Sequence, residues 1–135
     1  MCELFGFSSQ KKQNITGYLK EFYSHSVHHP HGWGLVTFEG NTASIEKQPM
    51  QASKSLRLQA RLAESVEAAA AFGHIRYATI GQIEYDNCHP YTRWTQPAGA
   101  GRWCTTEPFF LIRRWMRLWE SRRETQTVSA FCYIW

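Results

Sequence analysis

The chain has 135 residues, of which 43% are hydrophobic and 19% are charged. This length and composition predict one globular domain with a hydrophobic core. They exclude two domains of ordinary size and an intrinsically disordered chain. The net charge is +4, but the basic residues do not form a stripe, so nucleic acid is not expected as a partner.

The hydropathy pattern and the cysteines indicate the cellular compartment of the protein. No apolar run approaches the roughly 20 residues that a membrane span needs, and the N-terminus lacks the pattern of a signal peptide. The four cysteines, Cys2, Cys88, Cys104 and Cys132, include no CxxC pair. These features predict a reduced, cytoplasmic protein with no membrane partner.

The first predicted element, a short strand over Glu3–Ser9, begins directly after a cysteine. Removal of Met1 would leave Cys2 with a thiol and a free α-amine on the same carbon. An α-amine has a pKa of roughly 7.7–8.0, so near neutral pH it can accept the thiol proton. This is the nucleophile–base pair of N-terminal-nucleophile enzymes. The alternative is a cysteine at position 2 without a catalytic role.

The next elements follow from apolar spacing and turn residues. Thr16–Ser24 is expected to form a helix that buries Leu19, Phe22 and Tyr23 on one side. Residues 32–38 predict a strand whose two glycines allow another backbone segment to approach closely. Residues 39–41 form the turn, and 42–47 the returning strand.

The segment between the first helix and the second strand is rich in histidine. His25, His28, His29 and His31 lie within seven residues. A metal site built on His28, His29 and His31 is one interpretation. However, the spacing fits no standard zinc site, and no acidic or cysteine partner is near in the sequence, so no metal is expected.

A second helix and a buried strand complete the first part of the chain. Ser53 or Ser55 is predicted to cap a helix that runs to about Ser65. Its expected buried side carries Leu56, Ala60 and Ala63. Residues 68–77 then predict a buried strand, apolar as far as Gly73.

Arg76 lies near the end of this buried strand, where a charge is costly unless it is paired. The planar guanidinium suits a substrate carboxylate, which it can bind with two parallel hydrogen bonds. A structural ion pair, for example with Asp86, is the alternative.

Four motifs, taken in order, resemble one family. They are MCELFG at residues 1–6, HGWG at 31–34, GHIRYAT at 73–79 and NCHP at 87–90. This combination resembles the class II glutamine amidotransferases, and in particular their small stand-alone branch. The resemblance extends from Cys2 to about Arg93. One departure is His31, because this branch usually has Asp before Gly-Trp-Gly.

The resemblance implies a fold, a reaction and a set of roles. The fold would be α+β, the αββα sandwich of the N-terminal-nucleophile hydrolases. Cys2 would attack the side-chain amide of glutamine, with its own amine as base, and give glutamate and ammonia through a thioester. Arg76 would bind the α-carboxylate of glutamine, Tyr77 to Thr79 would shape the pocket, and His89 would support it. No cofactor is implied, and the acceptor of the ammonia stays unidentified.

Two elements that the family requires next are missing. They are an Asn-Gly pair that stabilises the oxyanion and an Asp that binds the substrate's α-amine. The asparagines of this chain, Asn14, Asn41 and Asn87, all lie upstream, and no Asp follows Arg93. The last 42 residues instead contain five of the six tryptophans, and they predict neither a regular helix nor a regular strand.

The genetic code offers an explanation for this tail. Codons that start one base earlier allow Val-His-Asn-Gly-Thr-Ile-Phe over residues 103–110, which contains the missing Asn-Gly pair. In the same frame, residues 123–130 allow Gly-Asp-Thr-Asp-Ser-Glu-Arg, which resembles the amine-binding segment of the family. We therefore expect a frame change between about Arg93 and Gln96.

The predicted organisation has two parts. Residues 1–93 would be the N-terminal part of a glutamine amidotransferase domain, and residues 94–135 an out-of-frame tail outside the family. The sandwich would then be incomplete and the activity impaired. A catalytically inactive fragment or interaction module is the alternative.

Overall fold

The computed structural model describes residues 2–39, 42–91 and 129–134. The longer elements are two helices, α1 (Thr16–Ser24) and α2 (Leu56–Ala63), and five strands, β1 (Glu3–Asn14), β2 (Trp33–Glu39), β3 (Thr42–Gln48), β4 (Glu67–Ile75) and β5 (Ser129–Ile134). Three single 3₁₀ turns, η1 (His25–Val27), η2 (Ala52–Lys54) and η3 (Tyr85–Asn87), connect them.

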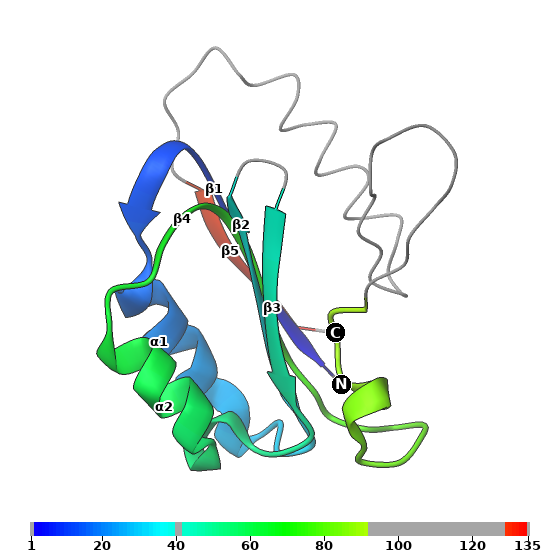
Figure 1. Cartoon of the computed structure of the whole chain (residues 1–135). Helices are drawn as coiled ribbons and strands as arrows, with labels where there is room; N and C mark the ends of the chain where they lie inside the picture. Colours follow the sequence, from blue (N-terminus) through cyan, green and yellow to red (C-terminus); the bar gives the residue numbers. More distant parts are fainter. Residues whose placement is uncertain (1, 40–41, 92–128, 135) are drawn as a thin grey trace, which may run out of the picture.

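The five strands form one antiparallel sheet in the order β3-β2-β4-β1-β5. β1 and β4 pair from Glu3↔Ile75 to Ser8↔Ala70, and β2 pairs with β4 from Trp33↔Ile75 onward. The start of β1, the start of β2 and the end of β4 therefore meet at one end of the sheet. The chain that follows β4 lies on the face opposite the helices (Figure 1).

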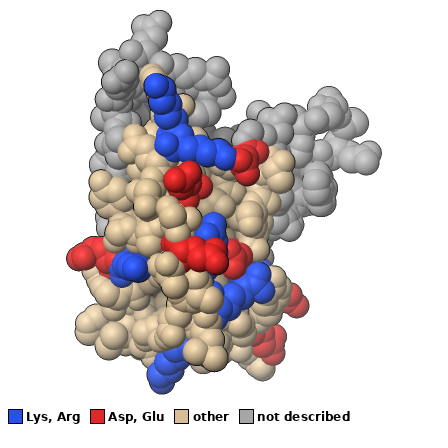
Figure 2. All heavy atoms as spheres, turned by 60° about the vertical axis from the view of Figure 1, so that its left-hand side comes forward, with Lys and Arg blue, Asp and Glu red and all other residues tan. Residues whose placement is uncertain are grey.

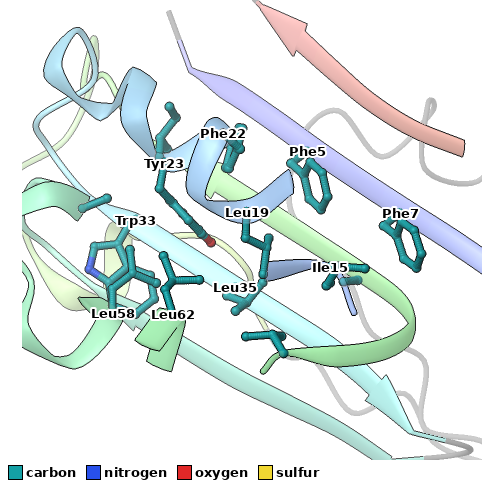
Figure 3. Close-up of a cluster of buried hydrophobic side chains, with 14 of the residues drawn as sticks. Phe5, Phe7, Ile15, Leu19, Phe22, Tyr23, Trp33, Leu35, Leu58 and Leu62 are labelled. Carbon is teal, nitrogen blue, oxygen red and sulfur yellow. The ribbon is translucent and has the colours of Figure 1, made fainter. Parts of the chain in front are cut away.

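The helices α1 and α2 cover one face of the sheet (Figure 1). Alternate residues of the strands point to this face, among them Phe5 and Phe7 of β1 and Trp33 and Leu35 of β2. They pack against a set of buried helix side chains, Leu19, Phe22, Tyr23, Leu58 and Leu62 (Figure 3). This apolar layer is the driving force for the fold.

The hydroxyl of Tyr23 reaches across this core. It donates a hydrogen bond of 2.8 Å to the carbonyl of Gly34, and its ring packs edge-on against Trp33 at 6.1 Å between centroids. Burial raises the pKa of Tyr23 well above its ordinary value, so the hydroxyl stays a donor. The bond links α1 to β2 close to the end of the sheet where β1 and β2 begin.

Most of the expected elements are confirmed. α1 has the predicted bounds, and it buries Leu19, Phe22 and Tyr23 as expected. β2, β3 and β4 begin and end within two residues of their predicted limits. The fold class α+β is likewise confirmed, whereas the turn at residues 40–41 lies outside the described residues.

Two expectations about local structure were wrong. β1 continues through the polar run after Ser9 to Asn14, since its last residues resume pairing with β4 after an irregularity between Ser8 and Gln13. The buried side of α2 carries Leu58 and Leu62, while Leu56 is 80% exposed.

The shift in the buried side of α2 has a local cause. Ser55 is the residue that caps the helix, and its hydroxyl accepts a hydrogen bond of 3.1 Å from the N–H of Leu58. Leu58 and Leu62 are four residues apart and so share one side of the helix. Ala60 and Ala63 lie on the exposed side.

The last described segment also differs from the sequence prediction. Residues 129–134 form β5, which pairs with the outer edge of β1 from Glu3↔Ile134 to Ser8↔Ser129. Strand pairing needs only a run of suitable residues and a free edge, so the proposed frame change is neither supported nor contradicted by β5. The rest of the predicted tail, residues 94–128 and 135, lies outside the described residues.

Charged side chains are interspersed on the helical side of the molecule. Figure 2 shows basic and acidic groups alternating over this side, without a large patch of one sign. Arg57 and Arg61 of α2 both donate to the carboxylate of Glu46 on β3, at 3.1 and 3.2 Å. Neither α1 nor α2 has the length and apolar character that crossing a membrane would require.

The packing of α2 predicts a contrast between two leucines. Leu58→Ala should lower the free energy of unfolding by about 2–5 kcal/mol, because it leaves a cavity beneath the helix. Leu56→Ala, at an exposed position of the same helix, should change it by no more than about 0.5 kcal/mol. Urea unfolding of both variants measures the difference, and equal losses would contradict the assignment of the buried side.

Candidate active site

The candidate site lies at the end of the sheet where β1 begins and β4 ends. The register pairs Glu3 with Ile75, so the next pair in line is Cys2 with Arg76. Side chains alternate between the two faces of a strand. Phe5 and Ile75 belong to the core beneath the helices, so Cys2 and Arg76 belong to the opposite face. Neighbours of this kind have Cβ atoms roughly 4.5–5.5 Å apart.

The thiol of Cys2 contacts the chain that leaves β4. Its Sγ atom donates to the carbonyl oxygen of Tyr77 at 3.6 Å, and the cysteine is partly exposed. The side chain of Tyr77 is 43% exposed, and Thr79 is exposed as well. Cys2 and the backbone of Tyr77 are thus brought together, with Thr79 two residues further along the same segment.

Arg76 is buried, with 6% of its surface exposed. Its Nη1 donates to the carbonyl of Gln82 at 2.9 Å, and its Nη2 donates to that of Ile80 at 3.0 Å. The ion pairs within residues 2–39 and 42–91 do not include Arg76 with Asp86, which was the alternative considered from the sequence. The guanidinium therefore fixes the loop after β4 through two of its five N–H donors.

His31 stands where a carboxylate was expected. Its backbone N–H donates to the carbonyl of Arg76 at 3.0 Å, and its Nδ1 accepts from the N–H of Ala78 at 2.8 Å. Its ring also lies 5.0 Å from that of Tyr77. The histidine thus supplies an acceptor to the segment that touches Cys2.

The predicted close approach at the start of β2 is confirmed at Gly34. A Cβ atom on Gly34 would lie 1.8 Å from the carbonyl oxygen of His89. A Cβ atom on Gly32 would lie 2.7 Å from the Sγ of Cys88. Both positions therefore need glycine, because the segment around His89 lies directly on the backbone of β2.

His89 belongs to a stack of aromatic rings on the face opposite the helices. Its ring lies 4.7 Å from that of His74 on β4 and 4.6 Å from that of Tyr91. Burial, together with the nearby Arg76, lowers the pKa of His89 to about 4. Burial, reinforced by His89, lowers the pKa of His74 to about 3. Both rings are neutral near pH 7, and the Nδ1 of His74 has no hydrogen-bond partner among the described residues.

Lys47 of β3 contacts the segment around His89, to which Cys88 belongs. The Nζ of Lys47 donates to the carbonyl of Cys88 at 2.8 Å, and it lies over the rings of Tyr85 and Tyr91 at 4.7 and 4.9 Å. Burial lowers the pKa of Lys47 and raises that of the Cys88 thiol. A shallow pocket lies beside Lys47, lined by Ile45, Tyr85, Asp86, Pro90 and Tyr91.

Two histidines of the loop before β2, His25 and His29, lie close to a buried carboxylate. The Nδ1 of His25 lies 2.7 Å from the carboxylate of Glu3, and the Nδ1 of His29 lies 3.7 Å from it. Glu3 is 1% exposed and lies on the helical face. Glu3 is therefore an acidic partner of this loop, although it is distant from the loop in the sequence. Within the described part of the chain no three metal-ligating side chains are grouped to hold an ion.

The family model described as "Glutamine amidotransferases class-II" matches residues 1–99. This chain belongs to that family. The match includes all four motifs and the whole of the candidate site around Cys2 and Arg76.

Three curated relatives are similar to this amidotransferase chain. An uncharacterized protein of Methanocaldococcus jannaschii is 31% identical over 93 residues, which are 69% of this chain and 26% of the relative. YafJ of Escherichia coli, which is named provisionally as a glutamine amidotransferase, is 30% identical over 69% of this chain and 38% of its own length. A Haemophilus influenzae protein with the same provisional name is 28% identical over 71% and 34%. The chain thus spans less than two-fifths of the length of these relatives.

Sequence reasoning missed several residues around the candidate site. His74 lies inside the GHIRYAT motif, so its place in the motif was an available signal. Glu3 and His31 also lie inside motifs, MCELFG and HGWG, but their partners come from segments distant in the sequence. Lys47 lies in no motif and gave no such signal.

The buried histidine of this site predicts a pH-dependent stability. His74 has a pKa of about 3 in the folded chain, against 6.5 for the free side chain. As the pH falls below about 6.5, the unfolded state takes up a proton that the folded state does not. Stability should therefore fall with acidification between about pH 6.5 and pH 3, by up to about 1.4 kcal/mol per pH unit from this group.

His74→Phe should remove that contribution while keeping a ring against His89. Urea unfolding at several pH values gives the slope of stability against pH for the variant and the original chain. His28→Gln, a change at an exposed histidine, is the control and should keep the original slope. An unchanged slope in His74→Phe would contradict the prediction.

Proposed function

We propose that this chain carries the glutamine-hydrolysing half-site of a class II amidotransferase, with Cys2 as the nucleophile. The observation that supports this best is the register that pairs Glu3 with Ile75, because Cys2 and Arg76 are the residues that adjoin this pair at the end of the sheet. The thiol would attack the side-chain amide carbon of glutamine and form a C–S bond. Ammonia would leave with the transferred proton, and water would then cleave the thioester to give glutamate.

The base for this step is the α-amine that Met1 removal exposes. The nearby histidines are poor alternatives. His25 and His29 lie with Glu3 on the helical face, and the sheet separates them from the thiol. The Nδ1 of His31 is already bonded to the N–H of Ala78. The low pKa values of His74 and His89 make them weak bases.

Arg76 is the proposed partner of the glutamine α-carboxylate. Three of its five N–H donors are not used by the carbonyls of Ile80 and Gln82, and the guanidinium is held rigidly by those two bonds. A fixed guanidinium loses little conformational entropy when it binds a carboxylate. Tyr77 and Thr79 would line the pocket between it and Cys2, and His89 would support that pocket.

The fold of the complete enzyme would be the αββα sandwich. One helical layer and one sheet are present in the described residues. The second sheet would cover the face that carries Cys2 and Arg76. It would also bring the Asn-Gly pair and the amine-binding Asp, which residues 94–135 lack. We therefore propose that this chain turns over slowly in the cytoplasm, and the acceptor of its ammonia stays unidentified.

A covalent probe tests the nucleophile without relying on turnover. A glutamine analogue with a diazoketone in place of the side-chain amide should alkylate Cys2 in protein from which Met1 has been removed. Mass spectrometry of the N-terminal peptide locates the adduct. Excess glutamine should slow the labelling, because both compounds would occupy the site beside Arg76.

Two variants serve as controls for the labelling. Cys2→Ala should abolish it, whereas Cys88→Ala, at the buried cysteine, should leave it in place. Labelling of other cysteines only, or labelling of Cys2 that glutamine does not slow, would overturn the proposed function.

A catalytically inactive interaction module is the second candidate. It is favoured by one observation, that the guanidinium of Arg76 already binds two carbonyls of its own loop. In that case Arg76 would be structural. Folded protein that neither reacts with the glutamine analogue nor releases ammonia would support this candidate.

The proposed frame change predicts a gain of activity. A gene in which the codons after about Arg93 start one base earlier should encode the Asn-Gly pair. The loss of one oxyanion donor typically lowers the rate by about 10²–10³. Ammonia release by the re-framed protein should therefore exceed that of the present chain by at least about 10². Equal rates would contradict the assignment of the tail as out of frame.

A further inference from the structure

His31 makes two contacts to the segment that leaves β4. Its Nδ1 accepts the N–H of Ala78 at 2.8 Å, and its ring packs against that of Tyr77 at 5.0 Å between centroids. Its own N–H also donates to the carbonyl of Arg76 at 3.0 Å. Three consecutive residues, Arg76 to Ala78, are therefore held by one side chain and its backbone.

The peptide unit between Tyr77 and Ala78 connects His31 with the thiol of Cys2. A peptide unit is planar, so the carbonyl of Tyr77 and the N–H of Ala78 belong to one rigid group. His31 binds the N–H, and the Sγ of Cys2 contacts the carbonyl oxygen at 3.6 Å. A rotation of this peptide would move both contacts together.

We propose that His31 is a positioning residue for Cys2, which acts by fixing the orientation of the Tyr77–Ala78 peptide. The imidazole replaces a carboxylate as the acceptor, with its Nδ1 lone pair on the Ala78 N–H and the ring proton on Nε2. The thiol of Cys2 is then held by the Tyr77 carbonyl at the mouth of the site. This inference rests on the proposed role of Cys2 as nucleophile.

The orientation of the peptide matters for the reaction in two ways. A nucleophile displaced by about 1 Å can lose roughly 10²-fold in rate. The contact with the Tyr77 carbonyl also holds the thiol against the loop, which limits the approach of an external reagent. Loss of the His31 contact should therefore slow the site-directed reaction, which needs alignment, and speed up unspecific alkylation, which does not.

The test uses protein without Met1 and two reagents. In His31→Ala, the first-order rate of Cys2 labelling by the diazoketone glutamine analogue at saturation should fall about 10–100-fold. The rate of Cys2 alkylation by iodoacetamide, followed on the N-terminal peptide by mass spectrometry, should rise severalfold. A purely structural role would move both rates in the same direction.

Conservative variants separate the acceptor from the bulk of the ring. His31→Asp should restore most of the labelling rate, since a carboxylate also accepts the Ala78 N–H, and His31→Asn should restore part of it. His28→Ala, at an exposed histidine of the same loop, is the matched control and should leave both rates unchanged. Equal labelling rates in His31→Ala and the original chain, or no recovery in His31→Asp, would overturn the proposal.

The two reagents also distinguish this inference from the proposed function. If the glutamine analogue fails to label Cys2 in the original chain, the proposed function fails. The iodoacetamide rates still decide whether His31 controls the thiol. Identical rates in the original chain and His31→Ala would then overturn the positioning role by themselves.

Discussion

The antiparallel pairing of β1 with β4 is the constraint on which the candidate site depends. It aligns Glu3 with Ile75, so that Cys2 and Arg76 adjoin this pair at the same end of the sheet, although 73 residues of chain separate the two. A register shift of one residue would move every side chain of β1 to the other face of the sheet. Burial of Phe5 and Phe7 beneath the helices prevents this shift. The hydrophobic core therefore determines which side of the sheet carries the thiol.

The two faces of the sheet carry different kinds of groups. The helical face holds the apolar core and the buried carboxylate of Glu3, which pairs with His25. The opposite face carries Cys2, Arg76 and the stacked rings of His74 and His89. The sheet thereby separates Glu3 and His25 from the face that carries Cys2. In the proposed reaction, the α-amine is the group that would accept the thiol proton.

Sequence reasoning succeeded where structure depends on local pattern. The bounds of α1 follow from residue spacing, and the need for Gly34 follows from its place at the start of β2. The same reasoning failed for α2, because the cap at Ser55 fixed a different buried side. It also missed the contacts of Glu3 with His25 and of His31 with Ala78. Those contacts join segments far apart in the chain, and only the topology brings them together.

The placement of β5 along β1 has a consequence for how this polypeptide behaves at high concentration. β1 lies inside the sheet, between β4 and β5, so its backbone groups are paired on both sides. Without β5 that strand would be open to templating by another copy, which is the usual route to strand exchange and fibre growth. The six residues of β5 thus move the open edge of the sheet one strand away from β1, and the strand that follows Cys2 becomes an inner strand.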